Sequence, residues 1–371
     1  MAMMRADRRR SATFSGDGFL NTFKVLIEPH GRQIIVPADR PVLEGALAAG
    51  LNLPHSCKSG HCASCRARLR AGKIEYPNGV PVGLAPQEAE AGHILLCQAR
   101  ARSDLVVEAR LIASVADVDI KTLPCRIARL TARSPDVTQV FLRLPAVEKL
   151  RFHPGQYLDI LLEGDLRRSF SIASPPHDSE LLELHVRHVA GGRFTEALGN
   201  ALPVGSLLHI EGPMGQFVYQ HNPEPALMIA GGTGFAPLKS MLRHVLEGGV
   251  DRPIHLYWGA RQPQDLYEEG LVLEWIRRYP QLQFTAVLSE ATETKAGHHR
   301  LGWVHEAVLA DHVSLSGFDI YAAGPPAMIE AIRATFPQRG VQDGRLLFDS
   351  FDYAGLATAG TSPASDPKPL A

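Results

Sequence analysis

Hydrophobic and polar residues alternate along the first part of the chain in the way that short β-strands require. Alternation over residues 22–28 and 33–36, interrupted by a Pro-His-Gly turn, predicts a β-hairpin. Asp39 is placed to cap a short helix that has Pro41 in its first turn and ends before Gly50. A loop rich in small residues and cysteine follows. The pattern therefore predicts a small α+β domain at the start of the chain.

The pattern changes to several short strands separated by Pro and Gly turns between residues 123 and 222. Short strands at this spacing are typical of an antiparallel barrel. The strands are expected at Cys125–Thr131, Thr138–Leu144, Tyr157–Leu162, Ser169–Ala173, Leu182–Val189 and Leu207–Glu211.

Apolar strand-like runs then alternate with amphipathic helical segments. This alternation predicts a parallel sheet with helices on both faces. The strands are expected at 226–229, 254–258, 283–287 and 319–322, and the helices at 238–246, 271–278 and 327–335.

These changes of pattern divide the chain into three domains with short flanking segments. The domains are expected at residues 21–112, 123–222 and 223–355, with a linker over 113–122. The basic start, residues 1–20, and the Ala-, Thr-, Ser- and Pro-rich tail, residues 356–371, are expected to be disordered.

Composition and charge exclude some classes of partner. Of the 371 residues 45% are hydrophobic and 21% charged, and the formal net charge is −1. No global field therefore favours nucleic acid, and no apolar run is long enough to span a bilayer. The basic start lacks the apolar core of a secretory signal. We expect a soluble cytoplasmic protein that does not bind nucleic acid or membranes.

Four of the five cysteines form one pattern. Cys57, Cys62 and Cys65 follow the spacing C-x4-C-x2-C, and Cys97 comes later in the same domain. This is the spacing of a plant-type [2Fe-2S] cluster, in which three thiolates converge from one loop. Structural zinc sites more typically use two separated C-x2-C pairs, so zinc and redox disulfides are the less favoured alternatives. Cys125 lies outside the pattern and is expected to be a buried structural thiol.

Basic residues without an acidic neighbour flank the cysteine loop. We call Lys58, Arg66, Arg68 and Arg70 the basic rim. An acidic patch on an electron acceptor could dock there, which would speed association at low salt. A simple solvated face explains the same charges equally well.

A short segment of the predicted barrel carries flavin-binding chemistry. Arg168, Ser169, Phe170 and Ser171 supply a cation for a pyrophosphate, a ring for stacking and a hydroxyl for the flavin N5 edge. Downstream, the Gly191-Gly192-Arg193-Phe194-Thr195 stretch opens a helix whose N–H groups could hold phosphate, although a plain hairpin turn fits its glycines as well.

Two glycine turns in the last domain predict a dinucleotide site. Gly231, Gly232, Thr233 and Gly234 lie between a buried strand and a helix, where N–H groups face a pyrophosphate. The Gly324-Pro325 pair ends a later strand, at the edge where ligands sit in open α/β sheets. The first turn is not a G-x-G-x-x-G fingerprint.

Taken together, these motifs resemble the ferredoxin–NADP reductase superfamily, in the branch with an N-terminal plant-type ferredoxin domain. The nearest likeness is to CDP-6-deoxy-hexulose-3-dehydrase (glucoseen) reductases, and reductase components of oxygenases share most motifs. The resemblance rests on stretches such as His55–Lys58, Arg167–Ala173, Glu183–Arg187, Ile210–Pro213, Ala230–Ser240 and Tyr257–Gly259.

The resemblance implies a β-grasp ferredoxin domain, an antiparallel flavin-binding β-barrel and a Rossmann-like parallel α/β domain. It implies FAD, NADH or NADPH and a [2Fe-2S] cluster as cofactors. It also implies that Asp349 and Phe351 lie near the flavin and that Ser171 acts with Asp349 at the catalytic centre. Phe170 and Ala323 depart from the usual tyrosine and cysteine of the family.

The function implied is an oxidoreductase that passes electrons from NAD(P)H through flavin to the cluster and then to a protein acceptor. The flavin is the converter between two-electron and one-electron steps. A dehydrase of deoxysugar synthesis and an oxygenase component are the competing acceptors. A redox sensor or pure carrier without sustained turnover is the alternative of another class. We expect a monomer when the protein is free.

Overall fold

The computed structural model describes residues 21–351, except residues 52, 56–57, 61–62, 110–117, 165, 179, 295–296 and 343. The basic start, the tail from residue 352, residues 113–117 of the expected linker and Cys57 and Cys62 lie outside the described residues.

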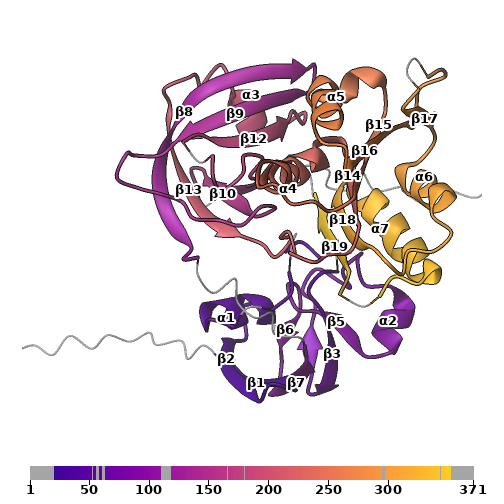
Figure 1. Cartoon of the computed structure of the whole chain (residues 1–371). Helices are drawn as coiled ribbons and strands as arrows, with labels where there is room; N and C mark the ends of the chain where they lie inside the picture. Colours follow the sequence, from indigo (N-terminus) through magenta and orange to yellow (C-terminus); the bar gives the residue numbers. More distant parts are fainter. Residues whose placement is uncertain are drawn as a thin grey trace, which may run out of the picture.

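The N-terminal domain is a five-stranded sheet with two short helices (Figure 1). Its strand order is β2-β1-β7-β3-β5, and the predicted hairpin is present as antiparallel β1 and β2. Strands β4 and β6 form a separate small ribbon. The elements are β1 (Thr22–Glu28), β2 (Arg32–Pro37), α1 (Val42–Ala48), β3 (Arg66–Ala71), β4 (Ile74–Glu75), α2 (Pro86–Glu90), β5 (His93–Leu95), β6 (Arg100–Ala101) and β7 (Leu105–Glu108).

One detail of the first helix differs from the sequence expectation. The residue before α1 is Pro41, without a side-chain cap, so the prediction that Asp39 caps the helix is wrong. Pro41 forms a bridge with Arg100, and the N–H of Val42 donates to the carbonyl of Ala99 at 2.9 Å. Backbone pairing to a neighbouring segment thus satisfies the first helical donor in place of a side chain.

The central domain is the expected antiparallel barrel, a six-stranded sheet of order β11-β10-β13-β8-β9-β12. An isolated bridge between Ile172 and Leu184 brings its two edges together. Inward-facing aliphatic residues of β8, β9, β10, β12 and β13 form one core, and Phe170 of β11 packs against it. The elements are β8 (Lys121–Ser134), β9 (Val137–Arg143), β10 (Tyr157–Leu161), β11 (Arg167–Ser171), β12 (Leu182–Arg187), α3 (Arg193–Ala197) and β13 (Leu207–Met214).

The C-terminal domain is a parallel six-stranded sheet of order β17-β16-β15-β14-β18-β19. Separate apolar clusters on its two faces pack against helices, as the alternating pattern predicts. The elements are β14 (Ala226–Gly231), η1 (Gly232–Gly234), α4 (Phe235–Glu247), β15 (Ile254–Ala260), η2 (Pro263–Asp265), α5 (Glu269–Arg278), β16 (Leu282–Leu288), β17 (His299–Leu301), α6 (Val304–Asp311), β18 (Asp319–Gly324), α7 (Pro326–Thr335), η3 (Phe336–Arg339) and β19 (Leu346–Ser350).

The N-terminal domain lies against both other domains (Figure 1). Gln216, just after β13, donates from its side-chain amide to the carbonyl of Leu53 at 2.9 Å. Arg333 of α7 lies 3.6 Å from the carboxylate of Glu88 in α2. The N-terminal domain thus contacts the barrel domain at Gln216 and the parallel-sheet domain at Arg333.

Candidate functional site

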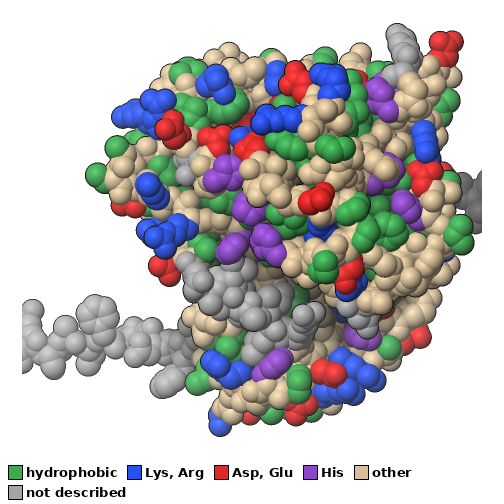
Figure 2. Space-filling view, viewed as in Figure 1, with side chains coloured by type: hydrophobic (Ala, Val, Ile, Leu, Met, Phe, Trp, Pro, Cys, Tyr) green, Lys and Arg blue, Asp and Glu red, His purple; other side chains and the backbone are tan. Residues whose placement is uncertain are grey.

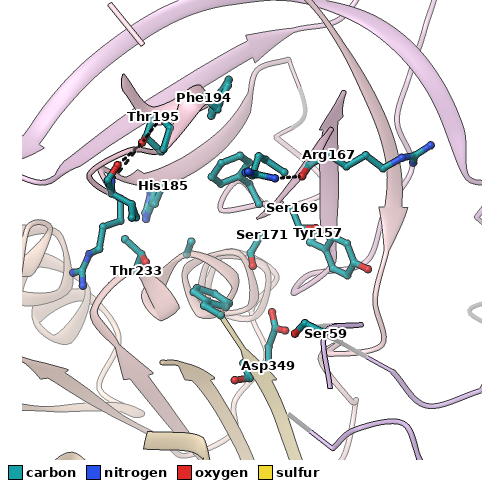
Figure 3. Close-up of a pocket in the computed structure, with 18 residues that line it drawn as sticks. Ser59, Tyr157, Arg167, Ser169, Ser171, His185, Phe194, Thr195, Thr233 and Asp349 are labelled. Atoms are coloured by element: carbon teal, nitrogen blue, oxygen red, sulfur yellow. Dashed lines mark hydrogen bonds between the residues drawn. The ribbon is translucent and has the colours of Figure 1, made fainter. Parts of the chain in front are cut away.

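A cavity of about 300 Å³ lies where the three domains meet, and we call it the flavin cavity. Residues of all three domains line it, and Figure 3 shows their side chains around it. Ser59 comes from the cysteine loop, Phe170 and Ser171 from the barrel, and Thr233 and Asp349 from the parallel sheet. The fold therefore gathers at one place motifs that are far apart in the sequence.

Strand β11 presents the predicted tetrapeptide to this cavity. Arg168, Ser169, Phe170 and Ser171 all line it, and Ser171 is only 8% exposed. The ring of Phe170 packs against the ring of Phe194 with centroids 5.4 Å apart. The hydroxyl of Ser169 is engaged elsewhere, because it donates to the buried carboxylate of Asp159 at 2.6 Å.

The second flavin motif lies on the same cavity at the start of α3. Gly192 and Thr195 line the cavity, and the hydroxyl of Thr195 donates to the carbonyls of Val189 and Gly192. A Cβ on Gly192 would lie 2.5 Å from that hydroxyl, so only glycine allows this close turn. Gly191 does not line the cavity among the residues described, and its N–H donates to Glu196 at 2.6 Å.

The end of β19 closes the cavity from the side of the parallel sheet. Asp349, Ser350 and Phe351 line it, and Asp349 is 7% exposed. Strand β19 pairs with β18 so that Asp349 lies opposite Ala323, and the N–H of Phe351 donates to the carbonyl of Gly324 at 2.9 Å. Ala323 itself is fully buried in the apolar core of the domain.

The two glycine turns border a second cavity of about 200 Å³, which we call the nucleotide cleft. Gly231, Gly232 and Pro325 line the cleft. The turns approach each other so closely that a Cβ on Gly324 would lie 2.9 Å from the Cα of Gly231. Thr233, which belongs to the first turn, lines the flavin cavity instead. The two cavities are therefore adjacent across the first glycine turn.

The described cysteines of the four-cysteine pattern are buried in the N-terminal domain. Cys65 is 3% and Cys97 is 4% exposed. The hydroxyl of Tyr76 accepts a hydrogen bond from the N–H of Leu95 at 3.0 Å, and it lies close to both thiols. Burial, together with the negative charge of the two sulfurs, raises the pKa of Tyr76, so this hydroxyl stays protonated beside them.

Comparison with known protein families assigns a domain type to each of these regions. Residues 25–102 match the 2Fe-2S iron-sulfur cluster binding domain, residues 124–219 the oxidoreductase FAD-binding domain, and residues 228–334 the oxidoreductase NAD-binding domain.

Whole-chain relatives contain the same three regions. The chain is 34% identical over 330 residues to a CDP-6-deoxy-L-threo-D-glycero-4-hexulose-3-dehydrase reductase of Yersinia pestis, covering 89% of this chain and 98% of the relative. It is 33% identical over 338 residues to reductase component 1 of a Comamonas terephthalate 1,2-dioxygenase, covering 90% and 98%. The chain belongs to the iron–sulfur flavoprotein reductases.

Solved structures support the same assignment. The Amycolatopsis cytochrome P450 reductase GcoB has a TM-score of 0.70 at 30% identity, covering 89% of this chain and 99% of that one. The ferredoxin reductase of a carbazole 1,9a-dioxygenase has a TM-score of 0.64 at 26% identity, covering 90% and 99%. The chain is thus an NAD(P)H oxidoreductase with FAD, NAD and 2Fe-2S domains, as the sequence predicts.

The residues of this reductase fit the groups that its domains imply. The flavin cavity offers a ring for stacking, buried hydroxyls and the guanidinium of Arg168, which suit an isoalloxazine and its phosphates. A Cβ at Gly192 or at Gly231 would collide with neighbouring protein atoms, so both turns at the cavities require glycine. Cys65 and Cys97 are buried in the same core of the N-terminal domain, and cysteine thiolates are the ligands of a [2Fe-2S] cluster.

Some residues that line the two cavities are not predicted as site residues from the sequence. Arg187 lines both, and its guanidinium lies against Gly232, where a Cβ would be 2.8 Å from its Nη2. Its Nε lies 3.4 Å from Asp136 and makes no hydrogen bond within the described part of the chain. Trp303 lines the nucleotide cleft and is 60% exposed. Strand periodicity would place Arg187 beside the cavity only once the barrel register was known.

The basic rim is less uniform than its sequence suggests. Arg66 is ion-paired with Glu88, and Arg70 with Glu108. Figure 2 shows acidic side chains among the basic ones on this domain. Arg68 is exposed, whereas Lys58 is directed toward the barrel. Glu88 and Glu108 lie well beyond the basic rim in the sequence, so the residues around the rim do not reveal these partners.

A buried ion cluster joins the barrel to the parallel sheet beside the flavin cavity. The ammonium of Lys239 lies 2.8 Å from Glu183 and 2.9 Å from Glu268, and His185 Nε2 lies 2.9 Å from Glu183. Burial alone would raise the pKa of Glu183, but His185 and Lys239 outweigh it and lower the pKa to about 2. The cluster links the two domains, and removing any one of its charges would leave an opposite charge buried without compensation.

Proposed function

We propose that this reductase transfers electrons from a dihydronicotinamide, through FAD and a [2Fe-2S] cluster, to a separate protein acceptor. The observation that carries the proposal is the flavin cavity itself. Ser59, two residues after Cys57, lines the same cavity as Ser171 and Thr233, so the flavin site borders both the cysteine loop and the nucleotide turn. Short distances between consecutive redox groups follow from that arrangement.

Each wall of the cavity has a separate task in this proposal. When bound, FAD supplies the conversion of one hydride into two single-electron transfers. Phe170 stacks on the ring system, Arg168 neutralises phosphate, and Gly192 and Thr195 shape the turn that receives it. Ser171 orients the reacting edge by a hydrogen bond, and Asp349 and Phe351 cover the opposite side near the nicotinamide.

The nucleotide cleft supports NADH as the preferred donor. Gly231, Gly232, Gly234, Gly324 and Pro325 shape the two turns that receive the dinucleotide. The guanidinium of Arg261 lines the cleft, but its charge already faces Asp136 at 3.4 Å and Asp265 at 3.5 Å. These carboxylates would repel the additional phosphate of NADPH.

For the acceptor we propose a dehydrase component, because the Yersinia pestis relative bears the name of such a reductase over nearly its whole length. An oxygenase component is the second candidate, favoured by the name of the Comamonas relative and by the GcoB fold. We propose that the exposed Arg68 of the basic rim serves in docking, together with Arg66 and Arg70, which are also exposed but are ion-paired with Glu88 and Glu108.

We further propose that the free protein is a cytoplasmic monomer. Within the described residues, no helix has the length and apolar character needed to cross a bilayer. Cysteine thiolates held for a cluster suit a reducing compartment.

Anaerobic turnover with separate acceptors tests the proposed function. Holoprotein and NADH should reduce cytochrome c through many cycles. The physiological acceptor, a dehydrase or an oxygenase component, should be reduced faster than cytochrome c. Stoichiometric reduction without repeated cycles would support a sensor and contradict the proposal. Higher turnover with the oxygenase would select the second candidate.

A further inference from the structure

Lys58 occupies an unusual place in the cysteine loop. It directly follows Cys57, and its backbone has φ of 56°, in the left-handed region that side chains other than glycine rarely adopt. The strain of such a residue persists only where surrounding contacts hold it. The side-chain amide of Gln98, the residue after Cys97, donates to the carbonyl of Lys58 at 2.8 Å. Segments carrying two cluster ligands therefore meet at Lys58.

The side chain of Lys58 leaves this loop and contacts the barrel. Its ammonium nitrogen lies 3.7 Å from the sulfur of Met214 and 5.8 Å from the centroid of the Tyr157 ring. Tyr157 and Met214 are cross-strand partners on β10 and β13, and Tyr157 is also the partner of Ser171 on β11. A cation near an aromatic face is attracted by the ring quadrupole.

Tyr157 and Ser59 line the flavin cavity from different domains. Lys58 thus contacts one wall of the cavity, while the next residue in the chain forms another part of that wall. A basic residue on the rim would ordinarily be assigned to the acceptor surface, but this one faces inward. From this placement we infer that Lys58 is a positioning residue, which seats the cysteine loop on the flavin cavity for intramolecular electron transfer.

The inference rests on the proposed function and deepens it. Each transfer moves one electron from the reduced flavin to a ferric iron of the cluster, which becomes ferrous, and no bond forms or breaks at Lys58. The residue acts only by keeping the donor and acceptor sites close. Loss of the contact should therefore slow electron transfer to the cluster and leave the preceding hydride step unchanged.

Stopped-flow mixing of the oxidised holoprotein with NADH, without oxygen, separates these two steps. In Lys58→Met, flavin bleaching should keep its wild-type rate, whereas cluster reduction should slow about tenfold as the cation–aromatic contact is lost. Lys58→Arg should restore most of the rate, because a guanidinium also binds an aromatic face. Lys73→Met removes the same charge from an exposed position of the same domain and should behave as wild type.

A second readout does not depend on turnover. Small-angle X-ray scattering of the oxidised holoprotein should show a larger maximum dimension for Lys58→Met than for Lys73→Met, because the N-terminal domain is less firmly seated. If Lys58→Met does not retain its cluster, Met214→Ala tests the same contact from the barrel and should also slow cluster reduction.

Wild-type rates of cluster reduction and unchanged scattering in these variants would overturn the role of Lys58. A wild-type protein whose cluster stays oxidised with NADH would instead overturn the proposed function, and the scattering comparison would still test the contact.

Discussion

The hydroxyl of Ser171 belongs to a buried residue of β11 at the cavity, whereas the exposed Ser169 donates its hydroxyl hydrogen bond to Asp159. Removing it in Ser171→Ala should slow hydride transfer from NADH about tenfold, the equivalent of one hydrogen bond of about 1.4 kcal/mol. The FAD content should stay unchanged. Stopped-flow bleaching measures the rate, and Ser206→Ala, outside the described cavity lining, provides a control. An unchanged rate would exclude Ser171 from the reacting edge.

Arg261 tests the choice between NADH and NADPH. Because two carboxylates already face its guanidinium, wild-type kcat/KM should be higher with NADH. Asp265→Asn removes one of these charges and should raise kcat/KM for NADPH by about tenfold, with little effect on NADH. Steady-state kinetics with both donors decides the point. A lower kcat/KM for NADPH in this variant would show that the charge of Asp265 does not repel the additional phosphate.

The first glycine turn is an element that leaves no room for a side chain. A Cβ on Gly234 would lie 1.9 Å from the carbonyl oxygen of Ala323, so η1 could not pack against β18. Gly234→Ala should lower the free energy of unfolding by about 2 kcal/mol or more and raise KM for NADH. Thermal unfolding and kinetics measure both effects. Gly270→Ala, which meets nothing within 4 Å, is the matched control.

Strand β15 contains a histidine that links stability to pH. Burial, reinforced by the nearby His312, lowers the pKa of His255 to about 4, and its Nε2 lies 2.9 Å from the hydroxyl of Thr285. The folded state thus favours the neutral ring. This stability is complete above pH 6.5 and is lost as the pH falls toward 4, by at most about 2 kcal/mol for a partly exposed group.

Chemical unfolding of His255→Gln should therefore depend less on pH than unfolding of wild type across this window. His209→Gln, at an exposed position, should retain the wild-type slope. Equal slopes in His255→Gln and wild type would show that His255 does not carry this linkage.

Periodicity and local spacing predict the elements that are long or strongly patterned. The hairpin, the barrel strands and the main β/α units are present in the structure. The three-residue edge strand β17, the eight-residue helix α6 and the five-residue strand β19 were not predicted, because elements this short carry little periodic signal. Among these elements β19 matters most for the site, because its pairing with β18 brings Asp349 to the cavity.

Site residues, too, can be predicted from the sequence where they belong to a local motif. Arg168, Ser171 and the glycine turns stand in contiguous motifs, so their chemistry is visible in the sequence. Arg187 and the inward direction of Lys58 depend on contacts between separate domains. No local pattern encodes such contacts, and only the assembled structure shows them.

At the scale of the whole molecule, the buried ion cluster couples the barrel to the parallel sheet. Lys239→Met would leave Glu183 and Glu268 with less compensating charge in the interior, and should destabilise the holoprotein by about 3 kcal/mol. Thermal unfolding followed by FAD fluorescence measures the loss, with Lys149→Met, an exposed position, as the control. A change no larger than the control's would show that the cluster is not an essential link.

The central claim is that electrons from NADH reach the cluster through the flavin cavity. Anaerobic titration of the holoprotein with NADH, followed by visible absorbance and low-temperature EPR, tests it most directly. The account predicts uptake of one electron per chain beyond the capacity of the flavin, together with the EPR signal of a reduced [2Fe-2S] cluster. Cys97→Ser should lose both that signal and the additional electron. Titration that ends with a reduced flavin and an EPR-silent, oxidised cluster would contradict the account.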